Sequence, residues 1–131
     1  MERFTIALES DIGIAVVGVQ AQARRLGFTQ DQIDRLGTAV SELARNIVKY
    51  AGCRGGDIVC QEEPRGQTLR LVVQARDNGP GIDDISRALS DHYSSSGSLG
   101  LGLPGVKRIM DECEVVSVVG SGTVVTIALQ R

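Results

Sequence analysis

The sequence offers little that a nucleic acid could bind. Aromatic residues make up 3% of the 131 residues, and the formal net charge at pH 7 is −2. A nucleic-acid-binding surface usually needs clustered lysine and arginine, often with aromatic side chains between them. We therefore expect no nucleic acid among the ligands of this protein.

Long apolar runs and paired cysteines are also missing. No stretch approaches the ~20 apolar residues of a membrane span, and the N-terminus, MERFTIALES, lacks the apolar core of a secretory signal. Cys53, Cys60 and Cys113 are odd in number and form no Cys-x-x-Cys pair, which disfavours a zinc site and a disulfide framework. These features predict a cytoplasmic protein with reduced thiols, no membrane contact, and a single domain over residues 1–131.

The pattern of apolar residues predicts strands that alternate with helices. The strongest helix spans 30–51: Thr29 and Gln32 form a capping-box pair before it, and Gly52 stands where a left-handed C-cap would follow. Gly120-Ser-Gly122 is typical of a hairpin turn. We predict an α+β two-layer sandwich, with a mixed, mostly antiparallel sheet and helices on one face. The predicted strands are 3–9, 57–62, 68–76, 113–119 and 123–130, and the other predicted helices are 10–26 (capped by Ser10-Asp11), about 83–90, and one with Pro104 at its first position.

The long helix carries polar residues on one shoulder of its apolar face. Glu42 and Asn46 are i,i+4 neighbours, and Lys49 continues the same flank. A carboxylate, an amide oxygen and an ammonium in this order could hold a metal–phosphate unit. Taken alone, however, this pattern more often marks a solvated helix face.

Glycine is the residue type in excess, with 16 in the chain and six of them between residues 79 and 105. The motif Asp77-Asn-Gly-Pro-Gly-Ile82 follows a predicted strand, and its composition alone would explain a turn. Its glycines would also let a flat ligand approach the backbone, with the carboxylate accepting a hydrogen bond from an exocyclic amine.

The second glycine-rich motif is GSLGLGLPG at 97–105. It contains Gly-x-Gly-x-x-Gly, but a serine-rich loop precedes it instead of a strand, so a dinucleotide-binding turn is disfavoured. Glycines that lead into a helix still present free amide groups to an anion. His92, the only histidine, has no carboxylate or cysteine partner nearby in sequence and is interpreted as a surface residue.

The order of these three motifs is what makes the pattern specific. Glu42-x-x-x-Asn46, Asp77-x-Gly79-x-Gly81 and Gly97-x-x-Gly100-x-Gly102 resemble the N, G1 and G2 boxes of the GHKL ATPases, among them DNA gyrase, histidine kinases and MutL. Within that superfamily the segments 41–52, 77–82 and 100–115 resemble the RsbT-type serine/threonine switch kinases of the bacterial stressosome and other partner-switching systems. The anti-sigma kinases share the three boxes.

The resemblance implies a Bergerat ATP-binding fold, with ATP and Mg²⁺ as cofactors and an ATP lid at about 83–103. It implies that Glu42 is the general base, that Asn46 coordinates Mg²⁺ and that Asp77 binds the adenine amino group. Arg45 lies inside the motif without an assigned role, and Lys107 is a weaker candidate for the phosphates. The residues implied to contact the nucleotide are Asn46, Lys49, Asp77, Gly79, Gly81, Ile82, Gly97, Ser98, Gly100, Leu101, Gly102, Leu103 and Lys107.

Three functions remain open at this point. The first, implied by the resemblance, is an Mg-ATP-dependent serine/threonine kinase that phosphorylates STAS-domain partner proteins, with a PP2C-type phosphatase as a downstream effector. The second is a nucleotide-gated anti-sigma factor or sequestering module with little or no kinase activity. The third is a structural α+β domain whose glycines only make turns.

Overall fold

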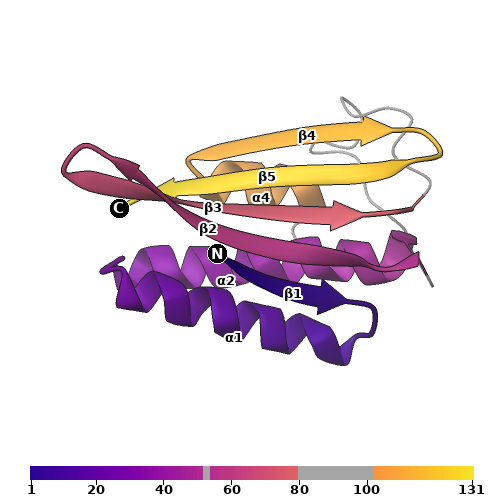
Figure 1. The fold of residues 1–131 in the computed structure, drawn as a ribbon, viewed down its shortest axis with the longest axis horizontal. Helices are drawn as coiled ribbons and strands as arrows, with labels where there is room; N and C mark the ends of the chain where they lie inside the picture. The colour runs from indigo at the N-terminus through magenta and orange to yellow at the C-terminus, as the bar shows by residue number, and fades with distance from the viewer. Residues whose placement is uncertain (52–53, 80–101) are drawn as a thin grey trace.

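The computed structural model describes residues 1–51, 54–79 and 102–131. Within these residues, five strands and four helical segments follow one another (Figure 1). The helix expected near 83–90, the Gly52 cap and the lid residues up to 101 lie outside the described residues. The elements are β1 (Glu2–Ile6), α1 (Ser10–Arg25), α2 (Gln30–Asn46), the π-helical turn η1 (Ile47–Ala51), β2 (Gly56–Arg65), β3 (Thr68–Asp77), α4 (Gly102–Ile109), β4 (Glu112–Val118) and β5 (Gly122–Gln130).

The five strands form one sheet in the order β1-β2-β3-β5-β4, and each pairing in it is antiparallel. β5 therefore lies between β3 and β4, while β1 and β4 are the two edges (Figure 1). The predicted α+β sandwich with a mostly antiparallel sheet is confirmed. The predicted hairpin at Gly120-Ser-Gly122 joins β4 to β5, with the Ser121 amide donating to the Val118 carbonyl over 2.9 Å.

The core lies between one face of this sheet and the helices. Cross-strand partners share a face, and the row Phe4, Ile58, Ala75, Val125 and Val115 runs across all five strands. The opposite face carries charged and polar side chains, among them Arg3, Asp57 and Arg76. On the covered face, α2 contributes a buried stripe that follows the predicted 3-4 spacing: Ile33, Leu36, Val40, Leu43 and Ile47.

The start of α1 differs from the prediction. The N-cap residue is Glu9, without a side-chain capping bond, where Ser10-Asp11 was expected to cap the helix. Asp11 instead turns back, and its Oδ2 accepts hydrogen bonds from the amides of Ala7 and Leu8, each over 2.9 Å. These two bonds lower the pKa of the Asp11 carboxyl, because they favour its charged form. Its carboxylate therefore fixes the β1–α1 turn.

The start of α2 follows the prediction, while the type of helix changes near its end. Thr29 and Gln32 form a complete capping box: the Gln32 amide donates to Thr29 Oγ1 over 3.1 Å, and the Thr29 amide donates to Gln32 Oε1 over 3.0 Å. The α-helix then stops at Asn46, and residues 47–51 form a π-helical turn. The predicted helix over 30–51 is therefore confirmed in its extent, but its last five residues are π-helical and not α-helical.

One smaller prediction is corrected at α4. The helix begins at Gly102, whose φ is +65°, so Pro104 lies two residues after the start and not at the first position. It still falls within the first turn, where a helical amide has no intrahelical partner, and so proline is tolerated there.

Among the described residues, no helix combines the length and the apolar character needed to cross a membrane.

Candidate nucleotide-binding site

Glu42 is a buried carboxylate on α2, with 3% of its surface exposed. It lies beside the apolar stripe, between Val40 and Leu43, which explains why the core covers it. Arg45, one turn later, approaches it with Nη1 3.5 Å from Glu42 Oε1. Burying a charged carboxylate costs free energy unless a nearby group compensates its charge. The sequence pattern placed Glu42 on a shoulder of the helix but did not reveal this degree of burial.

Asn46 is the last residue of α2 and is half-buried, one turn after Glu42 on the same side of the helix. The π-helical turn begins directly after it, and such turns often occur at functional sites. Lys49 lies in this turn and is exposed, with its Nζ 5.2 Å from the centre of the Tyr50 ring. The three predicted residues of the first motif thus follow one another from the buried helix to its exposed end.

Asp77 is the last residue of β3 and points toward the helices. Val73, Ala75 and Asp77 alternate along the strand, and the first two are buried in the core, so Asp77 belongs to the covered face. Its Oδ1 accepts a hydrogen bond from the Gly79 amide over 2.8 Å. This bond restrains the orientation of the Asp77 carboxylate.

The structure brings the first two motifs together. A Cβ placed on Gly79 would lie 3.0 Å from Ala51 Cα and 3.3 Å from the Tyr50 carbonyl oxygen, so the turn after β3 packs directly on η1. A Cβ on Gly56 would lie 3.0 Å from both Asp77 Cα and the Ile47 Cγ2 atom. Ile47, which follows Asn46, and the backbone of Asp77 therefore both contact Gly56, although they are thirty positions apart in sequence.

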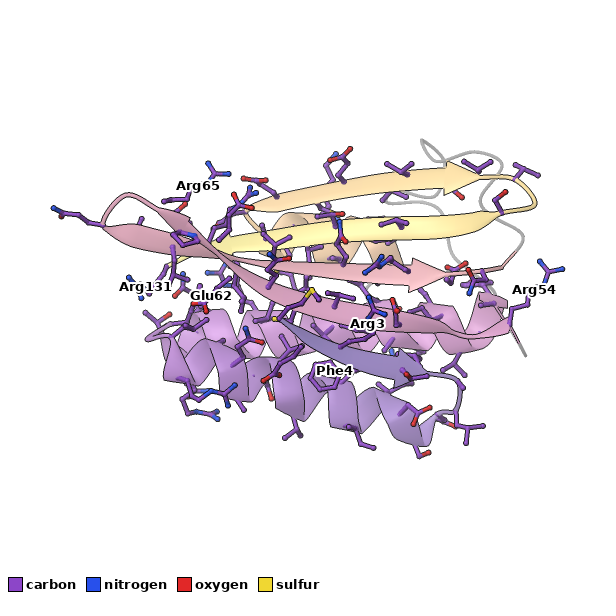
Figure 2. All side chains as sticks on the ribbon, viewed as in Figure 1. Arg3, Phe4, Arg54, Glu62, Arg65 and Arg131 are labelled. Carbon is purple, nitrogen blue, oxygen red and sulfur yellow. The ribbon has the colours of Figure 1, made fainter. Side chains whose placement is uncertain are left out.

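Sequence reasoning missed the residues that support this turn. Gly55, with a φ of +62°, accepts a hydrogen bond from the Asn78 amide over 3.3 Å. Arg54 donates to the Asn78 carbonyl over 3.3 Å from the same end of the sheet (Figure 2). Gly122 was predicted only as a turn residue, but a Cβ on it would lie 2.1 Å from the Asp77 carbonyl oxygen. The close approach of β5 to Asp77 is a second reason for glycine there, and no local pattern signals it.

The third motif is described only from Gly102 onward. Leu103 is buried at the start of α4, and α4 packs on α2, where Arg35 donates to the Ile109 carbonyl over 2.9 Å. Burial raises the pKa of the Cys113 thiol, and the positive charge of Lys107 partly offsets that rise, so Lys107 lies near the start of β4. The predicted residues Gly81, Ile82, Gly97, Ser98, Gly100 and Leu101 lie outside the described residues.

The donor atoms near Asn46 suit a magnesium–phosphate unit better than an all-protein metal centre. Within residues 1–51, 54–79 and 102–131, no group of three or more histidine, cysteine or acidic side chains could hold a metal ion. Mg²⁺ in phosphate-transfer sites usually takes one or two protein oxygens and completes its shell with phosphates and water. The amide oxygen of Asn46 fits that limited demand.

Comparisons with known proteins agree with this geometry. A family model described as "Histidine kinase-like ATPase domain" matches residues 6–129. The serine/threonine-protein kinase RsbT of Bacillus subtilis is 53% identical over 102 residues, which cover 77% of this chain and 74% of that protein. An anti-sigma F factor of Clostridium beijerinckii is 33% identical over 116 residues, covering 86% and 81% of the two chains.

Solved structures of histidine kinases share the fold. The mycobacterial sensor histidine kinase MprB superposes with a TM-score of 0.60 at 20% identity, covering 98% of this chain and 96% of that one. The catalytic domain of the histidine kinase ThkA gives 0.56 at 18% identity, covering 99% and 98%. The Bergerat fold expected from the three motifs is thereby confirmed. The chain belongs to the histidine kinase-like ATPase domain family and, within it, to the RsbT-like serine/threonine kinases of the partner-switching group.

Proposed function

We propose that this protein transfers the γ-phosphoryl group of Mg-ATP to a serine or threonine of a STAS-domain partner protein, and thereby acts as a partner switch in bacterial stress signalling. The family is that of an ATPase domain, which implies ATP binding. The observation that carries the proposal further is the buried carboxylate of Glu42 one helical turn before Asn46, together with the Asp77 carboxylate that the Gly79 amide restrains.

Asp77 is proposed to select adenine. Because its Oδ1 is held by the Gly79 amide, Oδ2 can accept a hydrogen bond from the exocyclic amino group of the base. Guanine has a carbonyl at the corresponding position and would leave that oxygen without a donor. The absence of a side chain at Gly79 lets the turn after Asp77 pack directly on η1, which positions the proposed acceptor.

Glu42 is proposed as the general base. A base acts by taking the proton from the attacking hydroxyl, and it must lie within hydrogen-bond reach of that proton. Its low exposure excludes most bulk water from the carboxylate, and Arg45 Nη1, at 3.5 Å, provides a compensating positive charge. The acceptor serine or threonine would therefore have to come within hydrogen-bond reach of this buried carboxylate.

The phosphates are proposed to lie between the end of α2 and the start of α4. Asn46 would hold Mg²⁺, which when bound neutralises phosphate charge and so lowers the barrier to phosphoryl transfer. Lys49 would add positive charge at the exposed end of the same helix. The amides that precede α4 at Gly102 would contact the β- and γ-phosphates.

The decisive experiment is transfer of labelled γ-phosphate to a panel of purified STAS-domain proteins, followed by mapping of the modified residue. We expect wild type to label a serine or threonine, and Glu42→Gln to bind ATP with unchanged affinity while transfer falls by at least about 100-fold. Glu62→Gln is a matched control, because Glu62 is exposed on β2 and should leave transfer unchanged.

A second variant tests the adenine contact independently of the chemistry. Asp77→Asn replaces an acceptor by an amide, so ATP affinity should fall by about 10- to 100-fold. Asp57→Asn, on the polar face of the sheet, is its control. If wild type binds Mg-ATP but labels no STAS-domain protein in the panel, the kinase proposal is wrong.

A second function has a specific observation in its favour, namely the 33% identity to an anti-sigma F factor. In that case the protein would sequester a sigma factor in a nucleotide-dependent way. Co-purification of a sigma factor that is unaffected by Glu42→Gln and lost in Asp77→Asn would favour sequestration over kinase activity. If the protein is instead the proposed kinase, the expected downstream effector is a PP2C-type phosphatase that the kinase activates.

A further inference from the structure

The C-terminal end of α4 is held from two sides. On one side, Arg35 of α2 donates from Nη1 to the Ile109 carbonyl over 2.9 Å. On the other side, Asp111, two residues after the helix, is bound to β5: its amide donates to the Ala128 carbonyl over 3.1 Å, and its Oδ2 accepts from the Gln130 amide over 2.7 Å. The end of α4 is therefore tied both to the helix layer and to the sheet.

The Arg35 side chain is itself restrained for this contact. Its Nε donates to Asp31 Oδ2 over 3.0 Å, one turn earlier on α2. A guanidinium carries its five N–H donors in one rigid plane, so fixing Nε also limits where Nη1 points. The acceptor, the carbonyl of Ile109, belongs to the last residue of α4, and the last carbonyls of a helix have no partner within it. Arg35 thus satisfies an acceptor that α4 itself leaves open.

These contacts also establish the direction of α4. The start of α2 lies at the Gln130 end of the sheet, because Gln32 Nε2 donates to the Gln130 carbonyl over 2.7 Å. The end of α2 lies at the opposite end, where Ile47 packs on Gly56. α4 finishes at the Gln130 end, and Leu103 near its start is buried in the core, so the helix extends back beneath the sheet. It therefore runs opposite to α2 (Figure 1).

The length of α4 brings its start near the first motif. The seven steps from Ile109 back to Gly102 span about 10 Å at 1.5 Å per residue. Seven steps along α2 from Arg35 lead to Glu42. Because the two helices pack on each other in opposite directions, Gly102 lies near the level of Glu42, one turn before Asn46. The contact at Arg35 thus sets how far along α2 the start of α4 reaches.

We propose that Arg35 is a positioning residue for the phosphates of ATP. By holding the far end of α4 on α2, it keeps the amides at Gly102 within reach of phosphates bound beside Asn46. This inference rests on the proposed function, which places the β- and γ-phosphates at the start of α4. Arg35 acts only through the helix, since it lies two turns of α2 before Glu42. Its effect comes from geometry, because a small misplacement of a binding group loses much of its interaction.

Competition titrations with ATP and with AMP measure this positioning apart from the adenine contact. Both ligands carry adenine, but only ATP carries the β- and γ-phosphates. For Arg35→Gln we expect the ratio of ATP affinity to AMP affinity to fall by about 10-fold, with the AMP affinity unchanged. Arg35→Lys keeps one cationic donor for the Ile109 carbonyl but loses the planar fork that also holds Asp31, so the ratio should fall by only about threefold.

Arg25→Gln is the matched control. Arg25 also forms an ion pair from a helix surface, with its Nη2 3.0 Å from Glu2 Oε1, but this partner lies on β1 and not on α4. The affinity ratio of this variant should equal that of wild type. Asp111→Ala releases the other side of the α4 end and should lower the ratio in the same direction as Arg35→Gln. Urea unfolding shows that each variant is folded under the conditions of the titration.

The possible results separate this inference from the proposed function. An ATP-to-AMP ratio for Arg35→Gln within about twofold of wild type would overturn the positioning role. Equal losses of ATP and AMP affinity would assign Arg35 a general structural role and also overturn it, as would the same fall in Arg25→Gln. A wild-type chain that binds ATP no more tightly than AMP would instead overturn the proposed phosphate contacts, and this inference with them.

Discussion

Replacing Gly79 by alanine should show whether the turn after β3 orients Asp77, the proposed adenine acceptor. A Cβ at this position would lie 3.0 Å from Ala51 Cα, 3.1 Å from Asp77 Oδ1 and 3.3 Å from the Tyr50 carbonyl oxygen. Each distance is shorter than the ~3.5–4.0 Å of an unstrained contact. Two of these neighbours are backbone atoms that cannot rotate away, so the turn that carries residue 79 must shift, and the Asp77 carboxylate must move with it.

The expected magnitude follows from what that movement breaks. Overpacking of this kind costs about 1–3 kcal/mol of folding stability. If the carboxylate turns away, it also loses the 2.8 Å hydrogen bond from the Gly79 amide, and a bond to a charged group contributes about 1.5–3 kcal/mol. Since that bond orients the proposed adenine acceptor, we expect ATP affinity to fall by about 10- to 100-fold.

Titration calorimetry with Mg-ATP, together with urea unfolding, measures both effects. Gly13→Ala is the matched control, because an added methyl group there meets nothing within 4 Å; its ATP affinity should equal that of wild type. An ATP dissociation constant for Gly79→Ala within about threefold of wild type, a change of less than ~0.7 kcal/mol, would refute the reasoning. It would mean that the Asp77 carboxylate does not depend on this turn.

Three further predictions concern stability and reactivity. Thr29→Ala removes the capping box with Gln32 and should lower the free energy of unfolding by about 1 kcal/mol, read from the urea midpoint. Gly18→Ala should destabilise by about 1–3 kcal/mol despite the better helix propensity of alanine, since the new methyl group would lie 2.4 Å from the Phe4 ring; an unchanged urea midpoint would contradict this packing. Burial raises the pKa of the Cys60 thiol to about 12, so a thiol reagent at pH 8 should label Cys60 only after unfolding. Because the unfolded thiol ionises near pH 9 and the folded one does not, this residue should make stability fall as the pH rises from about 9 toward 12.

Local signals in the sequence predicted the elements that depend on neighbouring residues. The capping box at Thr29 and Gln32, the apolar stripe of α2 and the hairpin at Gly120-Ser-Gly122 are all present. Each is determined within a few residues by backbone hydrogen bonding or by helical periodicity, so no knowledge of the tertiary structure was needed. The resemblance of the three motifs then predicted the fold, which the sheet order confirms.

The features that the sequence did not reveal are ones that distant residues determine. The π-helical turn at 47–51 follows a helix whose periodicity continues without a break, but there Ile47 packs on Gly56 and Ala51 on Gly79. Ser10-Asp11 is a good capping sequence, yet the Asp11 carboxylate is taken by the amides of the preceding turn. The burial of Glu42 and the contact of Gly122 with Asp77 also arise from packing across the sheet.

The position of β5 between β3 and β4 has a consequence for the order in which the molecule is completed during synthesis. β3 leaves the ribosome well before its partner, so its edge stays unpaired until residues 122–130 are available. Gly122, which contacts the Asp77 backbone, arrives with that last strand. A nascent chain that ends before β5 therefore has α2 and Asp77 but lacks the strand that supports the Asp77 turn. Nucleotide binding should thus begin only after residues 122–130 have been synthesised.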